Sequence, residues 1–236
     1  MPVALITGAS RGLGRHIALA FSDDGYSLAV NYMSSSTEAV HLIETTGRGS
    51  VALRADVGDS GQVGAIAEEI KREFGRLDVI INNAGIVKDQ LLLKQTEREW
   101  DSVIRTNLTG CFNVIRALSP LMIESGGGHI INISSYSGLK GQTGQAAYSA
   151  SKAALLGLTI SAAQELSEYN IRVNAVLPGY MMTEMGAGTQ KASEKAKDVS
   201  ILKKLSHPPE VADFILHLVK TENISGQIFN LDSRII

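Results

Sequence analysis

A tyrosine and a lysine four residues apart carry the clearest chemical signal in this chain. On a helix, the spacing of Tyr148 and Lys152 puts both side chains on one face. A tyrosine hydroxyl has an ordinary pKa of about 10, so it needs a nearby cation to exchange a proton near neutral pH. We therefore expect Lys152 to lower the pKa of Tyr148. Ser135 ends an apolar run shortly before them, where α/β enzymes place their sites. Taken alone, the pair also fits a solvated contact on a helix surface.

A glycine-rich turn near the N-terminus predicts a second kind of site, one that binds phosphate. Gly8, Gly12 and Gly14 stand between an apolar run and the amphipathic segment Arg15 to Phe21. Glycines let the backbone approach a pyrophosphate closely, while free N–H groups and the helix dipole face the anion. The spacing departs from the general Gly-x-Gly-x-x-Gly fingerprint. Such a turn alone is equally consistent with a tight connection, but its place between strand and helix favours a dinucleotide site.

The elements that must position these residues follow a regular alternation. Each of seven short apolar runs is followed by a helical pattern, and the runs show little polar alternation, as is typical of strands buried on both faces. We therefore predict a doubly wound parallel α/β sheet in a single domain over residues 1–236. The expected strands are Val3 to Thr7, Ser27 to Tyr32, Ser50 to Ala55, Asp78 to Asn82, His129 to Ser134, Arg172 to Leu177 and Gln227 to Leu231.

Three longer segments stand out between these runs. The helical patterns Glu97 to Glu124 and Gln145 to Tyr169 are long and apolar on more than one face, so we expect them to pack against another subunit as well as the sheet. The stretch from Tyr180 to Leu205 has weak periodicity after Pro178-Gly179. We interpret residues 180–205 as a flap over the substrate.

Composition excludes several classes of protein. The 236 residues carry 22 Lys and Arg against 24 Asp and Glu, a net charge of −2 that does not favour binding to nucleic acid. No apolar run is long enough to cross a bilayer. The single cysteine, Cys111, cannot form an internal disulfide, so we expect a cytoplasmic protein. The five histidines have no metal-ligand spacing, so we assign no metal.

Six motifs in chain order resemble the short-chain dehydrogenase/reductase family. Chance does not explain the whole set, which spans residues 3 to about 231. The resemblance implies a single Rossmann-type domain with a seven-stranded parallel sheet, an NAD(P) cofactor and a homotetramer. The motifs are Thr7-Gly8-x-x-x-Gly12-x-Gly14, Asn82-Asn83-Ala84-Gly85, Asn107, Ser135, Tyr148-x-x-x-Lys152 and Pro178-Gly179-x-x-x-Thr183.

The resemblance also implies a role for each residue. Tyr148 exchanges the proton and Ser135 holds the substrate oxygen. Lys152 binds the nicotinamide ribose and lowers the pKa of the tyrosine, while Asn107 fixes a water in the proton relay. The expected cofactor-binding residues are Gly8, Ser10, Arg11, Gly12, Leu13, Gly14, Asn31, Ser34, Asp56, Val57, Asn83, Ala84, Gly85, Tyr148, Lys152, Pro178, Gly179 and Thr183.

Charge at the end of the second expected strand bears on the choice of cofactor. An acidic residue there would bond the ribose 2′-hydroxyl of NAD, but this strand ends in Asn31, Tyr32 and Met33. Arg11 and Ser34 can instead meet a 2′-phosphate. We therefore expect NADP(H) rather than NAD(H).

Within the family, the chain is most similar to 3-oxoacyl-[acyl-carrier-protein] reductases of fatty acid synthesis, for example over Asn82 to Leu92 and Gly144 to Tyr148. This implies reduction of a 3-oxoacyl thioester. The alternatives are an NADP-dependent carbonyl reductase for a small or polyketide-like ketone and a member that binds nucleotide without turnover. Reductases of this group typically present basic residues where the acidic acyl carrier protein docks. In this chain the corresponding segments, at Glu124 and at Glu165 to Asn170, are acidic, so we expect weaker docking of the carrier protein.

Two further features concern the substrate cleft and the end of the last strand. Candidates to line the cleft are Lys88, Gln145, Tyr136 and Met182, and each of them fits a scaffold role equally well. The chain also departs from the family after its last strand, where the usual Asp-Gly-Gly or Asn-Gly-Gly is replaced by Asp232-Ser233-Arg234. Any contact made by this tail is therefore not predictable from the resemblance.

Overall fold

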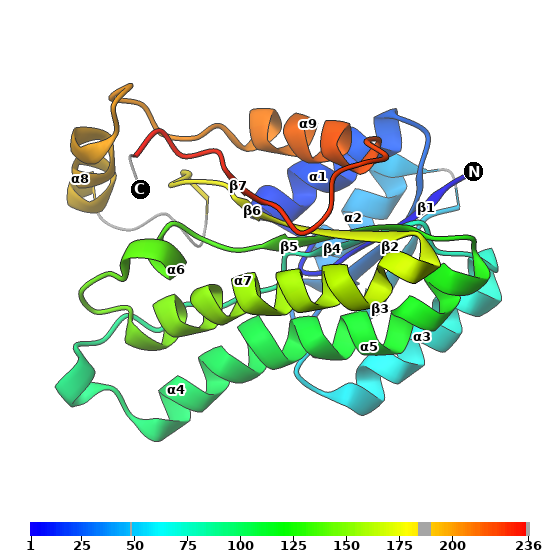
Figure 1. Ribbon diagram of the computed structural model, residues 1–236, viewed down its shortest axis with the longest axis horizontal. Coiled ribbons are helices and arrows are strands. Elements are labelled where there is room, and N and C mark those ends of the chain that lie inside the picture. The colour runs from blue at the N-terminus through cyan, green and yellow to red at the C-terminus, as the bar shows by residue number, and fades with distance from the viewer. Residues whose placement is uncertain (48, 184–189, 235–236) are drawn as a thin grey trace.

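The seven apolar runs form one parallel sheet because their Val, Ile, Leu and Ala side chains are buried on both faces. In the computed structural model, which describes residues 1–47, 49–183 and 190–234, the strand order is β3-β2-β1-β4-β5-β6-β7 (Figure 1). This confirms the doubly wound sheet. The strands are β1 Val3–Ile6, β2 Ser27–Tyr32, β3 Val51–Arg54, β4 Val79–Asn82, β5 Gly128–Ile133, β6 Ile171–Leu177 and β7 Ile228–Asn230.

Helices cover both faces of the sheet. Figure 1 shows α1, α2 and α9 on one side and α3, α5 and α7 on the other. Short 3₁₀ turns add Leu92–Lys94 and Ser167–Tyr169. The helices are α1 Gly12–Asp23, α2 Ser36–Thr46, α3 Ser60–Phe74, α4 Glu97–Ile104, α5 Gly110–Glu124, α6 Ser137–Lys140, α7 Ala146–Leu166, α8 Gln190–Val199 and α9 Pro208–Val219.

Alternate residues of each strand supply two separate apolar layers. Ile6 and Ile81 pack toward α1 and α9, while Leu5 and Ile80 pack toward α3 and α5. Phe21 on α1 is fully buried in the first layer. The sheet is thereby fixed from both sides, and the carboxyl ends of its strands become a rigid edge on which loops can hold functional groups.

The predicted helix from Glu97 to Glu124 is interrupted at its centre. Arg105–Thr109 forms a wide turn of π-helix between α4 and α5. Such turns are frequent at functional sites, and here the turn contains Asn107, whose side chain bonds to a neighbouring loop. The helix expected from Gln145 to Tyr169 is present as α7 with a final 3₁₀ turn.

The segment interpreted as a flap is only partly described. Its residues 184–189 lie outside the described part of the chain, and its second half contains α8. The role of residues 180–205 as a flap therefore stays a prediction. Among the described residues, no helix is both long and apolar enough to span a membrane, and none of their acidic, histidine or cysteine side chains group as metal ligands.

Candidate functional site

The glycine turn after β1 is packed tightly against the loop after β4. Gly8 has a φ of +62°, and a Cβ added there would lie 2.9 Å from the Cα of Ala84. A Cβ at Gly14 would lie 2.6 Å from the carbonyl oxygen of Gly8 and the same distance from Asn83 Nδ2. Side chains larger than hydrogen do not fit, so these glycines are required by close packing as well as by the turn.

Asn83 and Thr7 hold the two loops together. The Asn83 side-chain amide donates to the carbonyls of Thr7 and Gly8 at 2.9 and 3.1 Å. The Thr7 hydroxyl accepts the backbone N–H groups of Asn83 and Ala84, both at 3.0 Å. These bonds place the expected residues 83–85 beside the turn, at the point where the strand order reverses between β1 and β4.

The start of α1 can receive an anion. Arg11 stands in the N-cap position with an extended backbone and makes no side-chain capping bond, and the first turn contains no acidic residue. The first N–H groups of α1 therefore have no side-chain cap, and together with the positive end of the helix dipole they can bind an anion. Arg11 is exposed, whereas Ser10 and Leu13 are buried beneath the turn.

The residues expected near the adenosine end have distinct local partners. Asn31 is buried, and its amide donates to the carbonyls of Leu53 and Ala55, so it braces β2 against β3. Ser34 is exposed. The Asp56 carboxylate pairs with Arg105 at 2.7 Å, and Val57 is buried. Direct contacts of these four residues with a cofactor stay a prediction.

Ser135 and Tyr148 come together from two elements, as the sequence predicts. Ser135 follows β5, Tyr148 lies in the first turn of α7, and their side chains are hydrogen-bonded. The expectation of a lowered tyrosine pKa is wrong for the protein's own groups. Burial raises the pKa of Tyr148, the bond to Ser135 lowers it, and the charge of Asp89 raises it, with a net upward shift. Desolvation therefore outweighs the hydrogen bond from Ser135.

Lys152 is buried close to the tyrosine. Its ammonium donates to the carbonyl of Ile133 at 2.7 Å and lies 5.8 Å from the centre of the Tyr148 ring. Burial lowers the pKa of Lys152, which the neighbouring Cys111 offsets in part. Burial likewise raises the pKa of Cys111 to about 11, so this thiol is neutral and unsuited to act as a nucleophile.

Asn107 is fully buried and tied to the same loop. Its side-chain oxygen accepts the N–H of Ile86 at 2.8 Å, and its amide donates to the carbonyl of Ile86 at 3.0 Å and to Ser151 Oγ at 3.1 Å. Ser151 in turn donates to the carbonyl of Tyr148 at 2.7 Å. Asn107, Tyr148 and Ser135 are thus connected by hydrogen bonds, and Lys152 lies beside them. The role of Asn107 in holding a water stays a prediction.

Pro178 and Gly179 follow β6, which pairs with β5, the strand that leads to Ser135. Gly179 has a φ of +84°, and a Cβ there would lie 2.1 Å from Ser206 Oγ. Thr183 is partly buried, and its N–H donates to the carbonyl of Met181 at 3.0 Å. Contact of these residues with a nicotinamide stays a prediction.

Sequence reasoning assigned no role to three residues that hold the site. Thr7 opens the first recognised motif and Ser151 stands directly before Lys152, and both bond the loops and the helix that carry the named residues. Arg54, at the end of β3, donates through Nε to the carbonyl of Met33 at 3.2 Å. No local pattern points to Arg54, because only strand pairing brings β3 beside the end of β2.

The arrangement fits a dinucleotide and a proton-transfer reaction. The turn that excludes any Cβ, the uncapped start of α1 and the Tyr148, Lys152 pair all lie at the carboxyl ends of the strands. Gly8, Gly12 and Gly14 would hold a pyrophosphate, and Lys152 would hold a ribose hydroxyl. Tyr148 and Ser135 remain to act on a substrate oxygen.

Comparison with known proteins agrees with this geometry. A family model described as short chain dehydrogenase matches residues 2–194. A protein of Staphylococcus aureus (strain N315) named 3-oxoacyl-[acyl-carrier-protein] reductase FabG is 42% identical over 238 residues, which is 97% of this chain and 96% of that protein. Proteins with the same enzyme name from Synechocystis and Thermotoga maritima are 40% and 38% identical, and each covers 99% of this chain. This chain covers 96% and 97% of their lengths.

Proposed function

Because the chain belongs to the short-chain dehydrogenase family, we propose that it reduces a 3-oxoacyl thioester to the 3-hydroxyacyl form with NADPH. The hydrogen-bonded pair of Ser135 and Tyr148 carries the proposal, because it presents two hydroxyls to one substrate oxygen. The names of relatives that span nearly the whole chain support the substrate class.

The protein's own groups account for the proton. Ser135 orients the carbonyl oxygen, and Tyr148 donates its proton to that oxygen as negative charge develops. The bound cofactor supplies the hydride. Lys152 stabilises the tyrosinate that results, and Asn107 fixes the loop at Ile86 and, through Ser151, the start of α7.

The preference for NADPH over NADH has support in two arginines. Arg11 is exposed at the start of α1, and Arg54 lies against the backbone at Met33. A 2′-phosphate bound beyond the end of β2 would pair with both guanidiniums. It would not be repelled by a carboxylate of β2, because that strand contains no acidic residue. Arg11→Ala and Arg54→Ala should each weaken NADPH about tenfold and leave NADH affinity unchanged, as measured by nicotinamide fluorescence. Equal losses for both cofactors would contradict the assignment.

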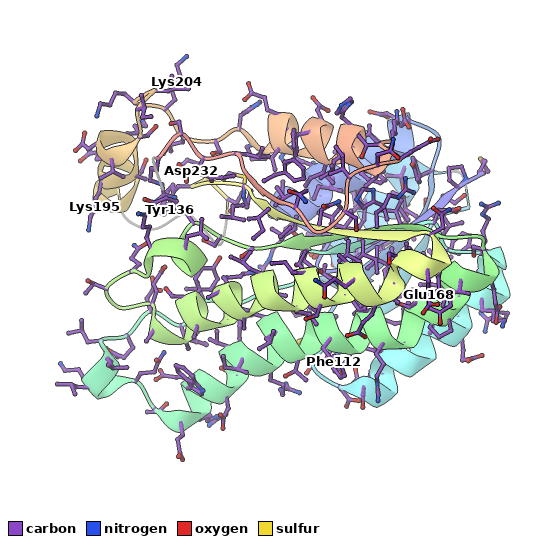
Figure 2. The ribbon with its side chains drawn as sticks, in the orientation of Figure 1. Phe112, Tyr136, Glu168, Lys195, Lys204 and Asp232 are labelled. Atoms are coloured by element: carbon purple, nitrogen blue, oxygen red, sulfur yellow. The ribbon has the colours of Figure 1, made fainter. Side chains whose placement is uncertain are left out.

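We further propose that the acyl group arrives on an acyl carrier protein, that the enzyme is a homotetramer and that it works in the cytoplasm. Exposed apolar side chains support assembly of several copies through α5 and α7: Phe112 on α5, labelled in Figure 2, and Ile160 on α7. Sedimentation of the wild type and of Phe112→Glu tests the tetramer. Turnover of carrier-linked and coenzyme A-linked 3-oxoacyl substrates tests the carrier. A site that recognises only the acyl thioester would reduce both at the same rate.

The deciding experiment follows NADPH oxidation with an acetoacetyl thioester and a panel of simple ketones and quinones. We expect turnover of the thioester, reduced by about 10²- to 10⁴-fold in Tyr148→Phe, because that variant keeps the ring and loses the proton. Tyr169→Phe is the matched control, since Tyr169 is exposed just before β6, at the opposite end of the strands from Ser135. Activity on ketones alone would keep the family chemistry and reject the thioester.

A further inference from the structure

The chain after β7 folds back onto the reaction centre as a short, self-bonded turn. Leu231 N–H donates to the carbonyl of Leu177 at 2.9 Å, which extends the pairing of β7 with β6. Asp232 N–H then donates to Asn230 Oδ1 at 3.1 Å, and Arg234 N–H donates to Asp232 Oδ1 at 3.0 Å. We call residues 231–234 the C-terminal turn.

Arg234 fastens this turn to Tyr136. Its Nε donates to Asp232 Oδ2 at 2.8 Å, and its guanidinium carbon lies 4.1 Å from the centre of the Tyr136 ring. The Arg234 and Asp232 side chains are only 15% and 6% exposed, so this ion pair is unlike the solvent-facing pairs elsewhere on the described chain. A planar guanidinium can bond a carboxylate and stack on an aromatic face at once, which an ammonium cannot do equally well.

Tyr136 leads directly to the substrate-binding hydroxyl. It follows Ser135, and its carbonyl accepts the N–H groups of Leu139 and Lys140, which begins α6. Ser135 Oγ accepts the N–H of Ser137 at 3.2 Å. The loop that carries Ser135 is thus short and closed by its own hydrogen bonds. Holding the Tyr136 ring in place therefore also restricts the neighbouring Ser135 hydroxyl.

The C-terminal turn also touches two segments that flank the centre. Asp232 Oδ2 lies 3.2 Å from the position of a Cβ at Gly179. The carbonyl of Ser233 accepts the N–H of Ile201 at 3.1 Å, and its hydroxyl bonds to Ser200, just after α8. Figure 2 shows Asp232 and Tyr136 near one another and α8 at the same end of the molecule.

We propose that Arg234 is a positioning residue: paired with Asp232 and stacked on Tyr136, it holds Ser135 against Tyr148 and links the segment after α8 to the reaction centre. The inference rests on the proposed carbonyl reduction but not on the identity of the acyl group. Arg234 acts through Tyr136 and needs no contact with substrate.

Removal of the guanidinium should therefore lower kcat more than cofactor affinity. In Arg234→Ala we expect kcat to fall about 10- to 100-fold, since small displacements of a reacting group have effects of this order, while the Kd of NADPH stays within about twofold. Tyr136→Ala should behave alike, and the double variant should be no worse than either single one. Tyr136→Phe keeps the ring and should retain activity, and Arg234→Lys should recover only part of it.

Arg76→Ala is the matched control. Arg76 pairs with Asp78, also two residues away, with Nε to Oδ2 at 3.0 Å and Nη2 to Oδ1 at 2.6 Å. That pair stands just before β4, at the opposite end of the sheet, and should leave kcat unchanged. Wild-type kcat in Arg234→Ala, or strict additivity with Tyr136→Ala, would overturn the proposal.

The pH profile separates positioning from a general loss of structure. Tyr148 faces Ser135, the ammonium of Lys152 and the carboxylate of Asp89, and the bond to Ser135 lowers the pKa of Tyr148. Reduction needs the protonated tyrosine, so activity falls as pH rises through that pKa. If Arg234→Ala releases Ser135, the pKa of Tyr148 rises and this fall moves to higher pH. An unmoved profile would count against the proposal.

Hydrogen exchange distinguishes this inference from the proposed function. The N–H groups of Gly138 and Leu139 bond to Ser135 and Tyr136 carbonyls and should exchange faster in Arg234→Ala than in wild type or Arg76→Ala. A wild type inert toward every carbonyl would reject the proposed function, yet faster exchange would still support the link from Arg234 to this loop. Unchanged exchange would reject the link whatever the substrate.

Discussion

The two ends of the parallel sheet use polar groups in different ways. At the carboxyl ends of the strands, Asn107 and Lys152 are buried and their polar atoms bond to backbone groups of the loops. At the amino ends, Lys71 and Glu124 form an exposed pair, and Arg76 is exposed where it pairs with the partly buried Asp78. Buried polar groups whose hydrogen bonds are all satisfied hold the site in one geometry, whereas exposed ion pairs contribute little to stability. Activity should therefore depend on the first end and tolerate changes at the second.

The acidic segments belong to this second end. Gly128 N–H donates to the carbonyl of Asn170 at 3.0 Å, and Asn170 Nδ2 donates to the carbonyl of Gly126 at 3.1 Å. The carboxylates of Glu124 and Glu168 therefore lie where β5 and β6 begin, whereas Ser135 follows the far end of β5. Figure 2 shows Glu168 at the opposite end of the molecule from Tyr136, the residue after Ser135. Their charge bears on an approaching partner and not on the chemistry within the same chain.

The strongest test of the comparison replaces one lysine at each end. Lys152→Ala should lower kcat/KM by about 10²- to 10⁴-fold, because Tyr148 loses the nearest cation that stabilises its ionised form. Lys71→Ala removes an exposed ammonium and should leave both turnover and the unfolding transition nearly unchanged. Steady-state kinetics and urea unfolding of the two variants give the comparison, and comparable kinetic losses would abolish it.

Acid should lower the stability of the folded chain through a buried histidine in the amino half of the sheet. His129 on β5 is buried beside Asn174, and burial, with a smaller effect of the Arg172 charge, lowers its pKa to about 4. The unfolded chain protonates this histidine below about pH 6.5, but the folded chain does so only near pH 4. The free energy of unfolding should therefore fall by roughly 3 kcal/mol as pH drops through this window. In His129→Asn, the free energy of unfolding measured with urea from pH 7 to pH 4 should not show this histidine-dependent fall.

Two helical glycines sharpen the contrast at smaller magnitude. Gly14→Ala forces a Cβ to 2.6 Å from Asn83 and Gly8, so we expect a loss of about 1–3 kcal/mol in stability and weaker NADPH binding. A Cβ at Gly64 on α3 meets nothing within 4 Å, so Gly64→Ala should stabilise by about 0.5–1 kcal/mol and leave binding unchanged. Thermal unfolding with and without NADPH checks both, and a destabilised Gly64→Ala would show that α3 carries an unrecognised constraint.

Sequence patterns predicted most of the architecture. All seven strands appear within one or two residues of the expected limits, because buried parallel strands need continuous apolar side chains and glycine turns mark their ends. The grouping of Ser135, Tyr148, Lys152 and Asn107 followed from motif order. The π-helical turn at Arg105–Thr109 was not predicted, because the apolar periodicity runs through it, and the bonds that join its Asn107 to Ile86 link segments far apart in the chain.

The sequence by itself thus determined the sheet and the glycine turn and pointed to the side chains that we propose to react, since these depend on periodicity and residue type along the chain. Only the tertiary structure decided the direction of the Tyr148 pKa, the place of Arg54 beside Met33 and the stacking of Arg234 on Tyr136. Each of these depends on burial or on a contact between segments far apart in the chain. Such desolvation and long-range contacts exist only once the layers have packed.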